Sequence, residues 1–349
     1  MNVPMMQPED AVPGRAGPVG RSLVVMDMRR LGNSGLTVSV VGLGGNNLGR
    51  AGTTSETADG AAAVVNAAVD AGITLFDTAD CYGKNPGLSE ELLGRALGAR
   101  REDVVVATKF GMDMGGANGP DHGARGSRRY IIRAVEASLS RLRTDWIDLY
   151  QFHTPDPLTP IDETIAALDA LVASGKVRYV GHSNRAGWQI ADAEFVARMA
   201  GQTRFISAQN HYSLLDRRAE LEVVPAALAY GIGVLPYFPL ASGLLTGKYG
   251  RGTAPAGSRL TRSRPELLQK ADFEQLGRFS AFAAARELSE VTVAVSWLAA
   301  QPAVASVIAG ATSPAQVVEN ARAARWEPST ADLAELDMIF PREPRVALF

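Results

Sequence analysis

Short apolar runs recur along the chain, and most of them are separated by about 30 residues, which is the length of one strand and its crossover helix. The stretches between the runs place apolar residues at helical spacing. Buried strands that alternate with amphipathic helices are typical of a parallel sheet. Eight such units favour an α/β fold, a closed (β/α)8 TIM barrel. The eight runs end near Gly44, Asp77, Lys109, His153, Ser183, Gln209, Tyr237 and Ala309.

The sequence divides into a leader and one expected domain. Residues 1–27 are rich in Pro, Gly and Met and lack periodicity, so we expect a flexible leader. Residues 28–349 hold all eight units and are expected to form a single barrel domain. Two short apolar stretches around the turn at 33–35 predict a β-hairpin that closes the bottom of the barrel. The Gly- and Arg-rich segments 111–127 and 251–270 follow strand ends, which predicts long loops over the C-terminal face.

Composition narrows the class of protein. Apolar residues make up 46% and charged residues 21%, with a net charge of −2, which is typical of a globular enzyme. There is no basic stripe for nucleic acid, and no apolar segment of membrane-spanning or signal-peptide character. We therefore expect a cytoplasmic protein without nucleic-acid or membrane partners. The single cysteine, Cys81, fits a reducing compartment. The sequence leaves open whether the protein is a monomer or a homo-oligomer.

Four polar residues stand at the ends of these runs or just beyond them. Asp77, Lys109 and His153 end their runs, and Tyr82 follows Asp77. Because the carboxyl ends of barrel strands meet at one mouth, the four side chains are expected to converge. A free Tyr has a pKa of about 10, and an adjacent Lys ammonium would bring the pKa of Tyr82 towards 7. Asp77 would hold Lys109, and His153 would polarise a carbonyl group. Each residue taken alone could instead be a cap, a snorkelling surface residue or a loop hydrogen-bonder.

Residues after the later strands could bind a cofactor. Ser183, Asn184 and Gln209 supply hydroxyl and amide groups for a carboxamide, and Tyr237 offers a ring for stacking. Lys248, in the segment ASGLLTGKY, could help to wrap a pyrophosphate.

A second candidate anion site lies near the C-terminus. There a Gly-Ala-Thr-Ser turn precedes a helix expected to start at Pro314, whose N-terminus favours an anion. Glu319 and Asn320, about one turn along, could meet an adenine edge. An ordinary Ser-Pro helix start explains this segment equally well.

These segments resemble the aldo-keto reductases, in particular bacterial members similar to potassium-channel β subunits and to sugar or ketone reductases. The similarity runs from about residue 28 to residue 338. The matching segments, in family order, are VGLGGNNLG, GITLFDTADCYG, VVVATKFG, DWIDLYQFH, KVRYVGHSN, SAQNHYSLLDR, VLPYFPLASGLLTGKY and VIAGATSPAQVVEN.

The resemblance implies a reversible, NAD(P)H-dependent reduction of a small-molecule aldehyde or ketone to an alcohol. Tyr82 would be the general acid and base, assisted by Lys109, Asp77 and His153. NADP(H) is favoured and NAD(H) is possible, because Thr312 stands where many members have a Lys or Arg for the 2′-phosphate. The implied cofactor contacts are Gly44, Gly45, Asn46, Asp77, Ser183, Asn184, Gln209, Tyr237, Leu240, Ser242, Leu244, Lys248, Gly310, Thr312, Gln316, Glu319 and Asn320. Phe110, Met112, Tyr212 and Phe238 are expected to line the substrate pocket.

Three other classes of protein are alternatives to a reductase. A metal-dependent barrel hydrolase could use His153, His182 and His211, but it leaves Tyr82 and Lys109 without a role, so no metal is expected. A Rossmann dehydrogenase fails because Asn47 stands where the fingerprint needs its third Gly. A non-catalytic, nucleotide-binding sensor subunit on the same fold stays open, since a fold alone does not imply turnover.

Overall fold

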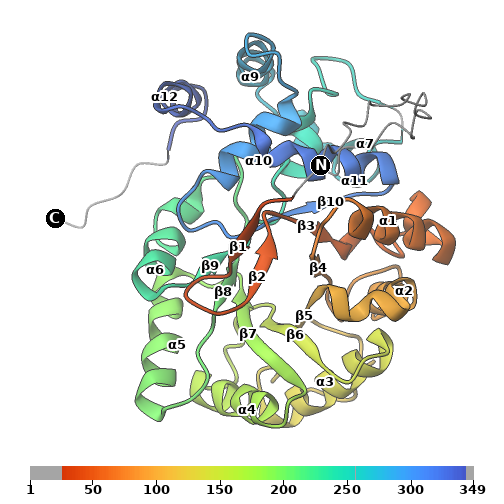
Figure 1. Cartoon of the computed structure of the whole chain (residues 1–349), viewed down its shortest axis with the longest axis vertical. Helices are drawn as coiled ribbons and strands as arrows, with labels where there is room; N and C mark the ends of the chain where they lie inside the picture. The colour runs from red at the N-terminus through yellow and green to blue at the C-terminus, as the bar shows by residue number, and fades with distance from the viewer. Residues whose placement is uncertain (1–25, 256, 343–349) are drawn as a thin grey trace, which may run out of the picture.

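The computed structural model describes residues 26–255 and 257–342, and eight parallel strands surround its centre (Figure 1). Each strand pairs in parallel with its neighbour in the order β10-β3-β4-β5-β6-β7-β8-β9. The strands are β3 (Val41–Gly44), β4 (Leu75–Asp77), β5 (Val105–Phe110), β6 (Ile147–Phe152), β7 (Val177–Ser183), β8 (Ser207–Gln209), β9 (Gly233–Val234) and β10 (Val307–Gly310).

Backbone hydrogen bonds between β9 and the segment before β10 join the two ends of this strand order. The Val234 N–H donates to the Ala303 carbonyl at 2.7 Å, and the Ala305 N–H donates to the Val234 carbonyl at 3.0 Å. Val234 and Val304 form a parallel bridge. The TIM barrel predicted from the spacing of the apolar runs is confirmed.

The predicted strand ends agree with the structure to within one residue, except for one. The strand expected to end near Tyr237 ends at Val234. Pro236 lies between them and has no N–H to give to the sheet, which explains the early end. Tyr237 instead forms an isolated bridge with His211.

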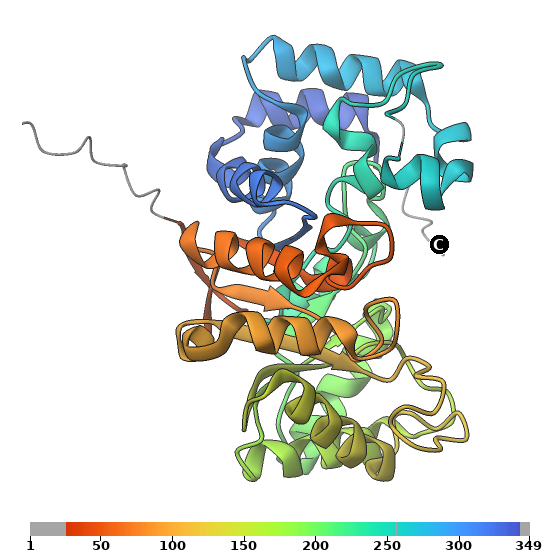
Figure 2. The ribbon, with the colours of Figure 1, turned by 90° about the vertical axis from the view of Figure 1, so that its right-hand side faces the viewer.

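Helices cover the outside of the strands (Figure 1). Several begin at the residue types that best cap a helix: the side chains of Thr57, Ser127, Ser289 and Ser313 each accept a hydrogen bond from a backbone N–H of the first turn. Figures 1 and 2 show α9 and α12 lying outside α10. The helices are α1 (Ala58–Asp70), α2 (Leu88–Leu97), α3 (Arg128–Leu142), α4 (Ile161–Ala173), α5 (Gly187–Ala200), α6 (Val223–Tyr230), α7 (Arg259–Ser263), α8 (Pro265–Gln269), α9 (Phe273–Ala284), α10 (Glu290–Ala299), α11 (Pro314–Arg322) and α12 (Thr330–Ile339).

The predicted hairpin is present as β1 (Met28–Arg30) and β2 (Thr37–Ser39), paired antiparallel. Leu31 and Val38 are fully buried and belong to a small apolar cluster with residues of the barrel strands, among them Leu75. The hairpin therefore closes one end of the barrel. The other end, at the carboxyl ends of the strands, is not covered by the hairpin. The main apolar core lies between the strands and the surrounding helices.

The two long segments predicted as loops, 111–127 and 251–270, lie on the side of the barrel towards which the strands point (Figure 2). The second contains the short helices α7 and α8. Residues 1–25 of the predicted leader lie outside the described residues, so the division into leader and domain stays a prediction. Within the part of the chain that the structure describes, no helix is long and apolar enough to cross a membrane.

Candidate active site

A buried ion pair lies at the open end of the barrel. The Lys109 ammonium donates to Asp77 Oδ2 at 2.8 Å and to the Thr78 carbonyl at 2.8 Å. Both side chains are buried, Lys109 completely. Burial alone would lower the pKa of Lys109, but the charge of Asp77, followed by that of Tyr82, raises this pKa above its usual value. Lys109 therefore carries a positive charge at neutral pH inside the protein.

Tyr82 lies next to this cation. The Lys109 Nζ donates to the Tyr82 hydroxyl at 3.3 Å and lies 4.7 Å from the centre of the ring. Burial raises the pKa of Tyr82 above its usual value; Lys109 opposes the rise and Asp77 adds to it. Lys109 thus lowers this pKa, as the sequence predicts, but it does not bring the pKa towards 7, because desolvation of the phenolate outweighs the attraction of the ammonium. Tyr82 keeps its proton at neutral pH.

His153 completes the predicted tetrad. Its ring meets the Tyr82 ring edge-on, with 5.8 Å between centroids. Burial, and then the charge of Lys109, lowers the pKa of His153 to about 3, so the imidazole is neutral. The Cys81 sulfur lies 3.8 Å from His153 Nδ1. Burial, and then the charge of Asp80, raises the pKa of the Cys81 thiol to about 12, so this thiol does not form a nucleophilic thiolate at neutral pH.

Two glutamines orient the Asp77 carboxylate from further strands. Gln209 Nε2 donates to Asp77 Oδ1 at 2.8 Å, and Gln151 Nε2 donates to the same oxygen at 3.2 Å. The sequence predicts a cofactor contact for Gln209, whereas Gln151 is a site residue that the sequence patterns above do not single out. A signal was available, because Gln151 is a polar residue within an apolar strand, two positions before His153 and hence on the same face.

The residues predicted to hold a carboxamide are close together and contact one another. The Tyr237 hydroxyl donates to Asn184 Oδ1 at 2.8 Å, and Asn184 Nδ2 donates to the His153 carbonyl at 3.0 Å. The Ser183 hydroxyl donates to the Gln209 carbonyl at 2.6 Å. The Asn184 residue is exposed, whereas Ser183 is buried.

The predicted stacking residue already has a ring partner. Tyr237 is stacked on His211, with 5.5 Å between centroids and planes 12° apart. Phe238 meets the Tyr237 ring edge-on at 5.1 Å. His211 thus covers one face of the Tyr237 ring.

The segment that follows Tyr237 has an unusual backbone. Phe238, Ala241 and Ser242 have φ values of 54°, 47° and 60°, which residues with a Cβ rarely adopt. Asn184 shares this conformation, with φ of 57°. Such backbone strain tends to collect at binding sites. The predicted cofactor residues of this segment are Leu240, Ser242 and Leu244, which are half-buried, and Lys248, which is exposed.

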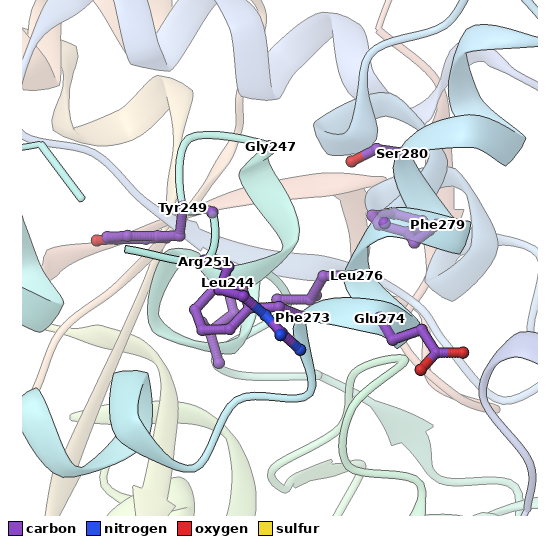
Figure 3. Close-up of a pocket in the computed structure, with 11 residues that line it drawn as sticks. Leu244, Gly247, Tyr249, Arg251, Phe273, Glu274, Leu276, Phe279 and Ser280 are labelled. Atoms are coloured by element: carbon purple, nitrogen blue, oxygen red, sulfur yellow. The ribbon is translucent and has the colours of Figure 1, made fainter. Parts of the chain in front are cut away.

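A cavity of about 360 Å³ lies between the end of this segment and α9 (Figure 3). Tyr249 lines one side, and Leu276 and Phe279 of α9 line the other. Leu244 is the one predicted cofactor residue in its lining, and no tetrad residue contributes. The cavity is thus separate from the tetrad.

At the other end of the predicted cofactor site, side chains of α11 form hydrogen bonds with the turn that precedes this helix. Gln316 Oε1 accepts hydrogen bonds from the Thr312 backbone N–H at 2.8 Å and from its hydroxyl at 3.1 Å. Asn320 is buried and donates to the Gly310 carbonyl at 3.4 Å, whereas Glu319 is exposed. The helix α11 starts at Pro314, as the sequence predicts, and Glu319 and Asn320 lie in its second half.

The first barrel strand, β3, ends at two consecutive glycines, so no side chain fills the space next to its carboxyl end. Gly44 and Gly45 are buried, and a Cβ atom on Gly45 would lie 3.0 Å from the Asp77 carbonyl oxygen and 3.2 Å from Ser89 Oγ. Asn46 Oδ1 is buried and has no hydrogen-bond partner among the described residues. A ligand hydroxyl, such as that of a ribose, would satisfy this oxygen.

Two of the four predicted pocket residues do not line a pocket. Phe110 and Tyr212 are completely buried. Phe110 stacks between Tyr150 and Phe152 in the outer core. The prediction is wrong for both residues, because Phe110 follows Lys109 on β5 and so points to the opposite face, and because Tyr212 hydrogen-bonds Glu220. Met112 and Phe238 keep accessible surface.

The three histidines of the alternative metal site do not form one. His182 is completely buried and meets Phe205 edge-on, and His211 Nδ1 lies 2.9 Å from Asp216. Over residues 26–255 and 257–342, no group of three or more His, Cys, Asp or Glu side chains could hold a metal ion.

A buried pair of acidic residues, Asp80 and Glu90, lies close to the tetrad in the sequence and shares the charge of Arg141. Asp80 and Glu90 are completely buried. Glu90 accepts hydrogen bonds from Arg141 at 2.6 Å and from Thr108 at 2.5 Å. Asp80 Oδ2 accepts a hydrogen bond from Asn118 at 3.1 Å, and Oδ1 has no side-chain partner within the described chain. Burial, followed by the negative charge of Glu90, raises the pKa of Asp80 well above its usual value.

Replacing Asp80 with Asn is expected to stabilise the protein at neutral pH. A carboxyl whose pKa is higher in the folded than in the unfolded state binds more protons when folded, so the free energy of unfolding falls as pH rises through that window. Asn cannot ionise, and its carbonyl can still accept from Asn118. The free energy of unfolding of Asp80→Asn should exceed that of the wild type by a difference that grows above about pH 4. The growth is up to about 1.4 kcal/mol per pH unit, and it stops at the pKa that Asp80 has in the folded wild type. Urea unfolding at pH 5 and pH 8 measures this difference in the free energy of unfolding.

Asp103→Asn is the control, because Asp103 lies on the surface. This substitution should change the free energy of unfolding by less than about 0.5 kcal/mol at both pH values. If Asp80→Asn raised the free energy of unfolding equally at pH 5 and pH 8, the raised pKa of Asp80 would be contradicted.

Comparison with known proteins identifies the family. The model of the aldo/keto reductase family matches residues 40–340. The chain is 39% identical to "Uncharacterized oxidoreductase YrpG" of Bacillus subtilis (strain 168), over 90% of this chain and 96% of that protein. It is 36% identical to "Probable voltage-gated potassium channel subunit beta" of Oryza sativa subsp. japonica, over 85% and 91%. It is 34% identical to "L-glyceraldehyde 3-phosphate reductase" of Escherichia coli (strain K12), over 89% and 92%. With a family match over most of its length and oxidoreductases among its relatives, the chain belongs to the aldo/keto reductase family.

Proposed function

We propose that this protein is an NAD(P)H-dependent reductase of an aldehyde or ketone, with Tyr82 as the proton donor. One observation carries the proposal: a fully buried, charged lysine lies 3.3 Å from the hydroxyl of a protonated tyrosine. A buried charge is costly, and the Asp77 pair offsets that cost. Such a charge is expected where it stabilises a negative charge that develops during a reaction.

Each tetrad residue has a separate task. Tyr82 donates its proton to the carbonyl oxygen as negative charge develops there, and Lys109 stabilises the phenolate that remains. Asp77, held by Gln151 and Gln209, keeps Lys109 in place. The same four residues serve the reverse reaction, with the Tyr82 phenolate as the base.

His153 is assigned the orientation of the carbonyl. Its imidazole is neutral, so one ring nitrogen carries a proton and the other does not. We assign the proton to Nε2, so that Nδ1 is the acceptor for the protonated Cys81 thiol 3.8 Å away. Nε2–H then polarises the carbonyl oxygen without adding a charge next to Lys109.

A nicotinamide dinucleotide, when bound, supplies the hydride to the carbonyl carbon. Three features fit such a group: the unpartnered Asn46 oxygen, the exposed Asn184, and the strained segment that begins at Phe238. Ser183, Asn184 and Gln209 would hold the carboxamide. NADP(H) is the favoured form by family, and NAD(H) is possible because Thr312 offers a hydroxyl in place of a cation. The cytoplasmic location stays a prediction.

A second candidate is a nucleotide-binding subunit without turnover. It is favoured by the relatives in rice and in Arabidopsis thaliana that are named as potassium channel β subunits, the latter 34% identical. An assembled tetrad argues for turnover, because a protein that only senses nucleotide has no need of a proton donor.

A turnover panel separates the two candidates. The purified chain is mixed with NADPH or NADH and a set of aldehydes and ketones, and oxidation of the cofactor is followed by absorbance. We expect turnover with at least one carbonyl, a higher kcat/KM with NADPH, and no effect of a chelator. Cofactor binding without turnover across the panel would favour the nucleotide-binding subunit. Absence of both binding and turnover would contradict both candidates.

A further inference from the structure

The outer face of α5 is apolar where a solvent-facing helix is expected to be polar. Trp188, Phe195 and Met199 are 66%, 53% and 88% exposed. Together with Asp192 they occupy positions i, i+4, i+7 and i+11, which form one stripe along a helix. The barrel-facing side of α5 is made separately by Ile190, Ala193, Glu194 and Ala197.

The neighbouring helix α6 extends this surface. Its sequence, VVPAALAY, contains no charged residue, and only Val223 and Ala227 are buried. Leu228 is 54% exposed. Phe195 of α5 meets Tyr230 of α6 edge-on at 6.0 Å, so the two helices form one continuous surface. We call it the α5/α6 face, made of Trp188, Phe195, Met199, Leu228 and Tyr230.

We propose that the α5/α6 face is the interface of a two-fold symmetric homodimer. The area available is sufficient for this partner. The exposed parts of its large side chains offer on the order of 400 Å² of apolar surface per chain, more than scattered apolar residues provide. Two copies bring about 800 Å², and with a polar rim in the usual proportion the interface reaches about 1,300 Å², the size of a stable one.

Charged side chains flank the α5/α6 face. Arg198 lies three residues after Phe195 and pairs with Glu194 of the same helix at 2.6 Å, and Arg204 pairs with the same Glu194 oxygen at 2.5 Å. Both arginines are exposed. An apolar centre with a polar rim is the usual anatomy of a protein interface.

The interface leaves the active site free. α5 lies on the outside of the barrel between α4 and α6 (Figure 1), whereas the tetrad lies at the open end of the strands. None of the five residues of the α5/α6 face contacts Asp77, Tyr82 or Lys109 through a described hydrogen bond or ring contact. The proposal therefore does not depend on the proposed reductase activity.

Met199→Glu tests the interface on the full-length chain. Analytical ultracentrifugation at micromolar concentration should show the wild type at twice the 36.9 kDa chain mass and Met199→Glu at the chain mass, with a Kd at least 100-fold higher. Met338→Glu is the matched control, because Met338 is 71% exposed on α12, a helix that is not part of the α5/α6 face. This control should stay dimeric. Thermal unfolding confirms that each variant is folded.

A wild type that is monomeric, a Met199→Glu variant that remains dimeric, or a Met338→Glu variant that dissociates equally would overturn the proposal. A larger assembly that Met199→Glu divides in half would support it. Binding of the wild-type monomer to lipid vesicles, abolished in Met199→Glu, would assign the face to a membrane and also overturn it.

Discussion

Replacing Tyr82 with Phe is expected to lower kcat of carbonyl reduction by about 10²–10⁴-fold, the range for loss of a general acid. The change removes the hydroxyl 3.3 Å from Lys109 Nζ and leaves the ring. Cofactor affinity should change little, because no predicted cofactor contact involves that hydroxyl. Steady-state kinetics with the best carbonyl of the panel, together with NADPH titration by fluorescence, measure both quantities.

Tyr150→Phe is the matched control for that substitution. Tyr150 lies on β6, is fully buried, and has a hydroxyl without a partner in the described part of the chain. Removing an unpartnered buried hydroxyl should leave turnover unchanged and should not lower stability. If Tyr82→Phe retained wild-type kcat, the assignment of Tyr82 as the acid would be wrong.

Replacing Lys109 with Met is expected to abolish turnover and to lower the free energy of unfolding by about 3–5 kcal/mol, since it leaves the Asp77 charge buried and unpaired. Few single substitutions on the chain should cost more. Denaturant unfolding measures the loss of stability, and the carbonyl assay measures the loss of turnover.

A second substitution separates these two effects. Asn at position 77 carries no charge, and its carbonyl can still accept from Gln151 and Gln209. Lys109→Met combined with Asp77→Asn should therefore recover most of the lost stability while turnover stays abolished. Unchanged stability of Lys109→Met alone would show that the ion pair is not buried in solution.

The sequence was sufficient to predict the barrel and the meeting of the tetrad, because both depend on periodicity. Apolar runs about 30 residues apart give the number of units, and a polar residue at a strand end has to lie at the mouth. The same reasoning gives wrong predictions where it overlooks the face of the strand on which a side chain lies. Phe110 follows Lys109 directly, so strand alternation sends its side chain into the outer core. Pro236 similarly ends β9 before Tyr237.

Other features depend on surroundings that no local pattern contains. The pKa of Tyr82 rises because burial removes water, and that burial depends on neighbours that are distant in the sequence, such as Lys109 and His153. The buried pair Asp80 and Glu90 comes from two segments with ordinary sequence patterns, brought together with Arg141 of α3. Gln151 could have been found, because a polar residue inside an apolar strand needs a partner.

The environment of Asp77 has a consequence for how the protein folds. Its carboxylate is bound by side chains that lie 32, 74 and 132 residues away in the chain, on β5, β6 and β8. Contacts of such long range form late, because they require most of the loop closures to be complete. During refolding, catalytic competence should therefore return only with the last cooperative step, and a fragment of the barrel that ends before β8 would lack the Gln209 amide that binds Asp77.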